Sequence, residues 1–222
     1  MSNLRSENII LAVPKGRILE ELVPLMKKSN IIPEQAFFDS SDRKLLFSSN
    51  LPWLKIIRVR SFDAATFVAF GGADIGVVGL DVLKEFNYPE LYAPIDLNIG
   101  KCRLSIAQPK NYIENGNAQL KIATKYPNIT NEYFAEKGIN VNCIKMNGAM
   151  EIAPKLDMAD KIVDLISSGM TMKANDLVEI ERIIEITSHL VINRTAFKTR
   201  SENIRHIMSL FQEVLIEKNS SL

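Results

Sequence analysis

The sequence predicts an α/β protein with a sheet that is rich in parallel strands. Short apolar runs recur along the chain, and amphipathic stretches with a helical period separate most of them. Strands that alternate with helices in this way are joined by right-handed crossovers. The chain has 222 residues, of which 46% are hydrophobic, so it can bury a sizeable core in one domain or in two small ones.

The first half of the chain begins with an apolar strand that Pro14 closes. A helix with one buried face follows, because Ile18, Leu22 and Met26 recur at the spacing of a helical stripe. Asp63 is expected to cap the next helix. The other elements expected here are a strand at 54–59, a helix that stops at Gly71 and Gly72, a strand at 73–79 and a short helix at 80–87.

The second half repeats this alternation. A helix at 128–138 is expected to have Asn128 or Thr130 as its N-cap and Gly138 just after its end. The stretch 178–187 is interpreted as a strand, although its length also suits a helix. The remaining expected elements are strands at 102–107, 120–124, 141–146, 162–166 and 188–194, a surface loop at 109–119 and a terminal helix at 201–218.

Composition argues against several classes of function. The formal charge is +1 and no long basic tract is present, so nothing favours nucleic-acid binding. Cys102 and Cys143 form no C-x-x-C motif and are interpreted as reduced, packed cysteines. Neither His189 nor His206 neighbours a nucleophile or a set of metal ligands. No apolar run is long enough for a signal core or a membrane span, so we expect a soluble, intracellular protein without a membrane partner.

The stretch KIVDLISSGMTMKAND, 161–176, is the first candidate site. Asp164 interrupts an apolar strand, and such a charge is costly unless it is paired or lies near the open end of the strand. Ser167, Ser168, Gly169 and Thr171 follow that end, where ligands bind in α/β sheets. Backbone N–H groups and hydroxyls there form a concavity suited to phosphate. The alternative is an ordinary polar turn.

The stretch AVPKGR, 12–17, is the second candidate. Lys15, Gly16 and Arg17 connect a strand to a helix, and two cations beside helix N–H groups suit an anion. The alternative is a solvated first turn. A third stretch, FGGADIGVVGLD at 70–81, lacks the spacing of a dinucleotide loop and is better explained by close packing of its elements.

Several motifs, taken in order, resemble the ATP phosphoribosyltransferase family, which performs the first step of histidine biosynthesis. They are LAVPKGRILEE, FGGADIGVVGLDVL, KIATKYPNITNEYFAEKGI and NGAMEIAPKLDMADKIVDLISSGMTMKANDLVEIE, and they cover most of the chain. The resemblance implies a two-lobed fold like that of type II periplasmic binding proteins, with the active site in the cleft. Lobe I would hold 1–100 and 186–222, and lobe II would hold 101–185.

The same resemblance implies that the first candidate loop cradles the 5′-phosphate of phosphoribosyl pyrophosphate (PRPP). Asp164 would accept a hydrogen bond from a ribose hydroxyl or help to hold a magnesium complex, and Glu151 would contact ribose hydroxyls. The implied PRPP-binding residues are Asp164, Ser167, Ser168, Gly169, Met170, Thr171 and Glu151. The chain departs from the usual family pattern at Met170, Asp176, Leu80 and Asp157, and Met170 still offers its backbone N–H.

The implied reaction transfers the phosphoribosyl group of PRPP to N1 of ATP and releases pyrophosphate. Lys15, Arg17 and Arg60 would be the catalytic cations, and ATP would be bound by Lys15, Gly16, Arg17, Arg43 and Arg60. Arg43 has an open alternative, a surface salt bridge. Mg²⁺ would arrive with PRPP or pyrophosphate, and no set of protein ligands for a metal is indicated.

Two other functions remain open from the sequence: a non-catalytic protein that binds an anionic solute, and a PRPP transferase that uses another base. The chain ends soon after one helix, so the resemblance implies the short form of the family. That form would be a cytoplasmic homodimer that joins a regulatory subunit resembling histidyl-tRNA synthetase in a hetero-oligomer. Histidine inhibition would then depend on the partner.

Overall fold

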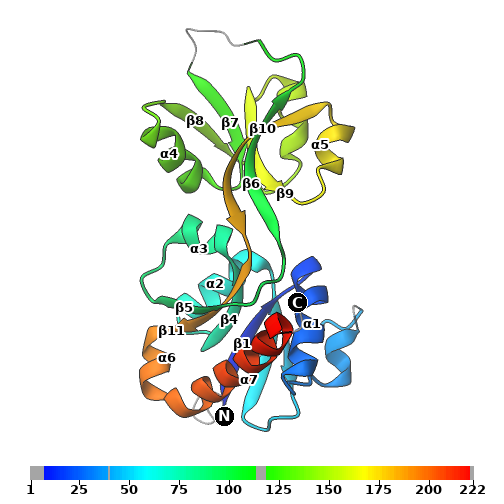
Figure 1. Ribbon diagram of the computed structural model, residues 1–222, viewed down its shortest axis with the longest axis vertical. Helices are drawn as coiled ribbons and strands as arrows, with labels where there is room; N and C mark the ends of the chain where they lie inside the picture. Colours follow the sequence, from blue (N-terminus) through cyan, green and yellow to red (C-terminus); the bar gives the residue numbers. More distant parts are fainter. Residues whose placement is uncertain (1–7, 40, 114–118, 221–222) are drawn as a thin grey trace. The chain divides into compact units, whose positions relative to one another are not determined.

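The computed structural model describes residues 8–39, 41–113 and 119–220. Contacts divide the chain into two compact units, which Figure 1 shows in sequence colours. Unit 1 contains Met1–Leu83, Asn87–Gly100 and Thr187–Leu222, and unit 2 contains Lys84–Phe86 and Lys101–Ile186. Unit 2 is therefore inserted into the chain of unit 1, apart from the short segment Lys84–Phe86.

Unit 1 is built on a six-stranded mixed sheet with the order β2-β3-β1-β4-β11-β5. Its strands are β1 (Ile9–Pro14), β2 (Leu46–Ser48), β3 (Leu54–Val59), β4 (Ile75–Gly79), β5 (Leu91–Asp96) and β11 (Ser188–Asn193). Only β1, β3 and β4 are parallel to one another, whereas β2, β11 and β5 pair antiparallel with their neighbours. The prediction of a sheet rich in parallel strands therefore holds for the middle of this sheet and is wrong for its sides.

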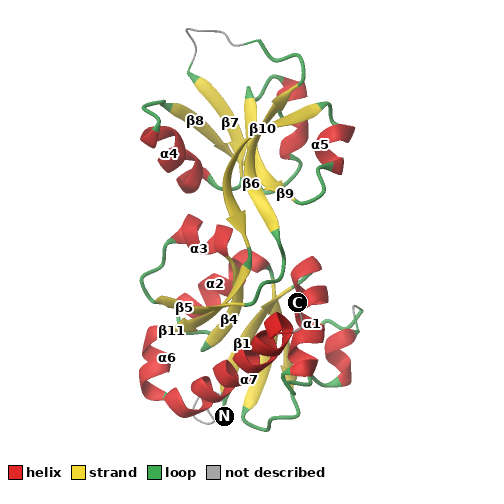
Figure 2. Ribbon diagram, in the orientation of Figure 1, coloured by secondary structure: helices red, strands yellow, loops and turns green. Residues whose placement is uncertain are grey.

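Helices cover the sheet of unit 1, as Figure 2 shows. They are α1 (Arg17–Lys28), η1 (Gln35–Phe38), α2 (Ser61–Ala69), α3 (Leu80–Phe86), α6 (Arg194–Thr199) and α7 (Ser201–Ser220), and α3 ends in the segment that groups with unit 2. The predicted stripe is realised in part, because Leu22 and Met26 of α1 are fully buried in the core. They pack with Leu11 and Val13 of β1 and with Phe211 of α7.

Unit 2 is built on a five-stranded sheet with the order β10-β6-β9-β7-β8. Its strands are β6 (Cys102–Pro109), β7 (Leu120–Thr124), β8 (Val141–Lys145), β9 (Lys161–Ile166) and β10 (Leu177–Ile186). Strand β7 is parallel to β8 and β9, whereas β6 is antiparallel to both β9 and β10. The other elements are α4 (Pro127–Glu136), η2 (Met150–Ile152), η3 (Pro154–Leu156) and α5 (Met170–Ala174).

Two expected helix caps are wrong. Helix α2 has Arg60 as its N-cap, and Asp63 lies inside the first turn. Helix α4 has Tyr126 as its N-cap instead of Asn128 or Thr130. The carboxylate of Glu85 accepts hydrogen bonds from the backbone N–H groups at the start of α4, at 3.1 Å. A carboxylate that is distant in the sequence thus satisfies the donors that a local cap would serve.

Other expectations have clear outcomes. The stretch 178–187, for which a helix was an alternative, forms most of β10, because it pairs with β6 along its length. Gly138 follows α4 with a φ of 72°, as expected for a residue just past a helix end. Strands β2 and β5 and helices α5 and α6 were not predicted. Within the part of the chain that the structure describes, no helix is both long enough and apolar enough to cross a membrane.

Candidate functional site

Candidate ligand-binding cations of unit 1 lie together at one edge of its sheet. Strands β1 and β3 are parallel, with Pro14 opposite Val59, so both end at the same edge. The backbone N–H of Lys15 donates to the carbonyl of Val59 at 2.9 Å. Lys15 and Arg60, which follow the two strands, therefore lie next to each other at the carboxyl edge, where α/β sheets bind ligands.

Gly16 is the turn between β1 and α1. It is the N-cap of α1, and its φ of 82° and ψ of −152° lie in a region that is almost restricted to glycine. No atom would meet a Cβ at this position within 4 Å. Backbone conformation, and not lack of space, is therefore the reason for glycine here.

Arg17 has a structural contact that the sequence did not indicate. Its Nη2 donates to the carbonyl of Gly100 at 3.3 Å, and its Nε lies 3.9 Å from Oε1 of Glu21. The N–H of Gly100 in turn donates to Oε2 of Glu21 at 2.8 Å. Arg17 thus helps to attach the segment around Gly100 to α1, and 47% of its side chain stays exposed.

Arg43 lies near the same edge. The backbone N–H of Arg58 in β3 donates to the carbonyl of Leu45, and Nη2 of Arg58 donates to the carbonyl of Asp42 at 3.4 Å. These bonds hold the segment that contains Arg43 along the end of β3. Among the described residues, no ion pair or hydrogen bond engages the side chains of Lys15, Arg43 or Arg60, all of which are exposed. Within the described part of the chain, Arg43 therefore has no acidic partner for the surface salt bridge that was its alternative role.

In unit 2, the first candidate loop connects β9 to α5. Gly169 is the N-cap of α5 with a φ of 74°, a conformation that favours glycine. The N–H of Met170 donates to Oγ of Ser168 at 3.4 Å, and the Met170 side chain is 72% exposed. Ser167, Ser168 and Thr171 are also exposed. The loop therefore presents hydroxyls around a glycine turn.

Asp164 is the most perturbed carboxyl group of this region. Burial raises the pKa of Asp164 to about 6, and the negative charge of Glu151 acts in the same direction. The N–H of Leu165, which donates to Oδ1 at 2.8 Å, and the charge of Lys125 oppose this rise in pKa. A partly buried carboxyl with a raised pKa near the end of a strand is typical of a functional site.

Glu151 lies in η2 and is partly buried. Its effect on the pKa of Asp164 indicates that the two carboxylates are close enough to interact. Within the described ranges, no group of three or more acidic, histidine or cysteine side chains could hold a metal ion. When magnesium is bound mainly by substrate phosphates, a protein usually contributes one or two carboxylates as ligands.

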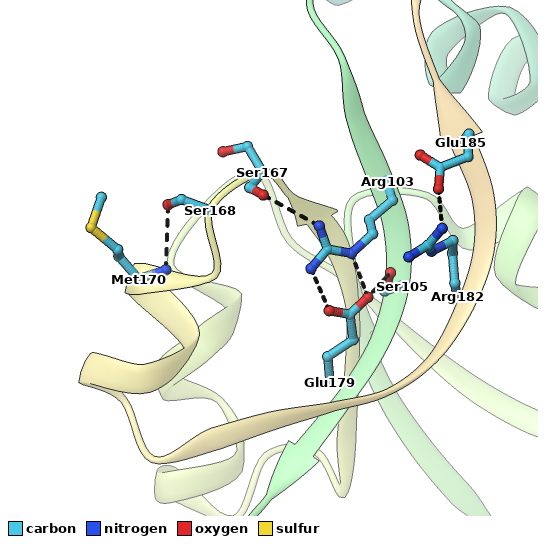
Figure 3. A network of polar contacts seen from close by, with 8 residues as sticks. All are labelled: Arg103, Ser105, Ser167, Ser168, Met170, Glu179, Arg182 and Glu185. Atoms are coloured by element: carbon cyan, nitrogen blue, oxygen red, sulfur yellow. Dashed lines mark hydrogen bonds and ion pairs between the residues drawn. The ribbon is translucent and has the colours of Figure 1, made fainter.

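A polar network that the sequence did not predict lies beside the loop (Figure 3). Nε and Nη2 of Arg103 each donate to one oxygen of Glu179 at 2.6 Å, and Nη1 donates to the carbonyl of Ser167 at 3.3 Å. Oγ of Ser105 donates to Oε1 of Glu179 at 2.8 Å. The guanidinium of Arg103 holds the pKa of Glu179 below its usual range, so this carboxylate stays ionised at neutral pH.

A cavity of about 640 Å³ adjoins the network. Its lining includes Arg103, Glu179, Ser168, Gly169 and Lys173. In the sequence, the network is indicated by no more than an arginine near the start of a predicted strand. Nothing in the sequence could connect this arginine to a glutamate 76 positions away.

These features define a class: an α/β protein with the fold of type II periplasmic binding proteins, a cationic sheet edge in one unit and a hydroxyl-rich glycine loop in the other. The chain belongs to the ATP phosphoribosyltransferase family, because the model of that family matches 60–213.

Curated relatives agree with this assignment over nearly their whole length. The ATP phosphoribosyltransferase of Rhodospirillum rubrum is 52% identical over 212 residues, which is 94% of this chain and 93% of the relative. That of Paramagnetospirillum magneticum is 50% identical over 211 residues, which is 93% of this chain and 96% of the relative.

Solved structures agree on the fold. The chain is similar to a chain of the ATP phosphoribosyl transferase (HisG:HisZ) complex from Thermotoga maritima, with a TM-score of 0.79 and 34% identity, covering 94% of this chain and 99% of that one. A protein called Tv2483, solved with L-arginine bound, has a TM-score of 0.59 at 13% identity and covers 99% of this chain and 88% of its own. The second likeness concerns the fold alone.

Proposed function

We propose that this chain transfers the phosphoribosyl group of PRPP to N1 of ATP and releases pyrophosphate, as the first step of histidine biosynthesis. Within the structure, the observation that supports this most is the loop after β9, where partly buried Asp164 precedes exposed hydroxyls and Gly169. Membership of the ATP phosphoribosyltransferase family supports the same reaction.

The reaction forms a C–N bond between the anomeric carbon of PRPP and N1 of ATP, and it breaks the C–O bond to pyrophosphate. The ring nitrogen already has a lone pair, so a covalent enzyme intermediate is not needed. The protein must align N1 with the anomeric carbon and stabilise the negative charge that develops on the leaving group.

In this proposal, the loop of unit 2 binds PRPP. Backbone N–H groups and hydroxyls of Ser167–Thr171 donate hydrogen bonds to the 5′-phosphate, and Gly169 allows close backbone approach. Asp164 accepts a hydrogen bond from a ribose hydroxyl in its ionised form. Glu151 contacts the same sugar.

The cations of unit 1 act on phosphates. Lys15, Arg43 and Arg60 are exposed near one sheet edge and suit the phosphates of ATP or the departing pyrophosphate. Arg17 acts with them through the exposed part of its side chain, while its bond to Gly100 fixes its position. Gly16 allows the backbone to approach the nucleotide.

Magnesium belongs to the proposal as a companion of PRPP. Asp164 and Glu151 are the carboxylates of this chain that fit a magnesium ion held mainly by substrate phosphates. When bound, the ion neutralises part of the charge of the pyrophosphate. The contribution of the protein is to orient the sugar and its phosphate.

The active assembly in this proposal is a hetero-oligomer in the cytoplasm, where PRPP and ATP are available. The support is the likeness to a chain of the HisG:HisZ complex. The partner is a regulatory subunit that resembles histidyl-tRNA synthetase, and the catalytic chain itself forms a homodimer.

Incubation of the purified chain with PRPP, ATP and magnesium tests the proposed reaction, with pyrophosphate release as the measurement. We expect release that depends on both substrates. Saturable binding without release would indicate a solute-binding protein. Release with another base, but not with ATP, would indicate a different PRPP transferase.

A further inference from the structure

We infer that Arg103 and Glu179 form a positioning brace for the phosphate loop, and that this brace sets the affinity for the 5′-phosphate of PRPP. This inference rests on the proposed role of the loop as the phosphate site. The brace is defined by the side chains of Arg103, Glu179 and Ser105 and by the carbonyl of Ser167 (Figure 3).

The sheet order gives Arg103 access to both neighbouring strands. Arg103 lies on β6, which is placed between β10 and β9. Its guanidinium reaches Glu179 on β10 with two nitrogens and the end of β9 at Ser167 with the third. A planar guanidinium with donors on all three nitrogens can make such a fork, whereas an ammonium group cannot hold three acceptors in one plane.

A bulge in β10 directs Glu179 to the face of the sheet on which Arg103 lies. Glu179 pairs with Ala107 and Glu181 pairs with Ile106, so Ile180 is the extra residue of a β-bulge. Neighbouring positions on β6 face opposite sides, so the two glutamates do as well. Glu179 shares a face with Ser105 and Arg103, and Glu181 pairs with Lys137, the C-cap residue of α4.

The bond to Ser167 fixes the orientation of a peptide group in the loop. In a planar trans peptide, the C=O of one residue and the N–H of the next point in opposite directions. When Arg103 holds the carbonyl of Ser167, the N–H of Ser168 is turned away from Arg103. The brace therefore determines the direction of a backbone donor within the Ser167–Thr171 loop.

The brace has little effect on overall stability. About a quarter of each side chain is exposed, at 25% for Arg103 and 27% for Glu179, so solvent weakens their attraction. The cavity beside the loop also leaves the loop without tight packing on this side. A loss of the brace should therefore change the position of the loop more than the stability of the fold.

The test compares ligand affinities of variants by isothermal titration calorimetry. Arg103→Lys keeps the charge and loses the fork, and Glu179→Gln keeps the size and loses the charge. The matched control is Glu181→Gln, which removes a carboxylate of the same strand whose ion pair lies on the opposite face. The affinity for ribose 5-phosphate reports on the loop of unit 2. The affinity for ATP reports on the nucleotide site proposed in unit 1.

We expect Arg103→Lys and Glu179→Gln each to weaken the binding of PRPP and of ribose 5-phosphate by about 10-fold, since a misdirected backbone donor loses its hydrogen bond to a charged phosphate. ATP affinity should stay within about 2-fold, the melting temperature should stay within about 3 °C, and Glu181→Gln should match the unchanged protein. The inference is wrong if the two variants lose as much affinity for ATP as for ribose 5-phosphate, or if both keep their affinity for ribose 5-phosphate.

The loop variants Thr171→Ala and Gly169→Val separate this inference from the proposed function. If they weaken ribose 5-phosphate while the brace variants do not, the loop binds phosphate and the brace alone is wrong. If neither set changes its affinity, the loop is not the phosphate site, and the proposed site is wrong together with the brace.

Discussion

Asp164 is the residue at which stability and function are expected to conflict. Its pKa in the folded chain, about 6, lies above the usual value of 3.8, so the folded state holds the proton to higher pH than the unfolded state does. The free energy of unfolding therefore falls as pH rises from about 4 to about 6, and it stays lower above that range. A shift of about 2 pKa units corresponds to about 3 kcal/mol.

Asp164→Asn should remove this penalty. We expect the variant to be more stable than the unchanged chain at pH 7 by about 2–3 kcal/mol, with little difference between them at pH 4. Urea unfolding across this pH range measures the effect, and Asp157→Asn, which changes an exposed carboxylate of the same unit, is the control. Parallel stability curves for Asp164→Asn and the unchanged chain would contradict the burial of this charge.

The hydroxyl and glycine of the loop lead to a second prediction at this scale. Thr171→Ala should weaken PRPP binding by about 1–3 kcal/mol, because a charged phosphate loses a donor. Gly169→Val should be worse, because the position has a φ of 74° and a side chain would hinder backbone approach. Titration of PRPP into each variant gives the affinities, and two unchanged values would remove the loop from the site.

At the scale of elements, the start of α1 depends on the conformation of Gly16. Gly16→Ala should lower the free energy of unfolding by about 1–3 kcal/mol, the usual cost of a side chain in this backbone region. Gly148 is a matched control, because no atom approaches its Cβ position either and it lacks a positive φ. Crowding is absent at both positions, so chemical unfolding of Gly16→Ala and Gly148→Ala isolates the effect of backbone strain, and similar losses in both would contradict the argument.

Elements with a clear apolar period were predictable from the sequence. Strand β1, helix α1 and the terminal helix α7 are in the predicted places, because local residues alone determine their buried faces. Strand β5 was not predicted, since it is mostly exposed and has no apolar alternation. Short α5 has only one buried residue, Met172, and thus no pattern to detect.

The candidate site was predictable to the extent that its parts are contiguous. Lys15–Arg17 and Ser167–Thr171 are each local in the sequence, and their roles remain predictions. Arg60 and Lys15 are neighbours because of the register in which β1 and β3 pair. Arg103 and Glu179 meet because β6 lies between β10 and β9 and because β10 has a bulge next to Glu179. A single sequence reveals neither the strand order nor the bulge.

At the scale of the whole molecule, regulation is expected to need a second chain. We expect the isolated chain to be a dimer with some activity and little sensitivity to histidine, because an effector acts only through a site that some subunit supplies. Addition of a regulatory subunit resembling histidyl-tRNA synthetase should raise activity and confer inhibition. Assays with and without histidine, with mass measured in solution, decide this, and strong inhibition of the isolated chain would contradict it.

The insertion of unit 2 into unit 1 has a consequence for the order of folding during synthesis. The N–H of Ser188 donates to the carbonyl of Ile99 within unit 1, while Cys102 and Ile186 pair within unit 2. In each unit, the two connecting segments of the chain are therefore held together by contacts within that unit. Strand β11 lies between β4 and β5 in the sheet of unit 1, and among the described strands β5 pairs with β11 alone. On a ribosome, β5 therefore emerges long before its neighbour, whereas the inserted unit is complete at Ile186. The unit whose chain begins second should be the first to finish folding, and the sheet that contains β1 should close last.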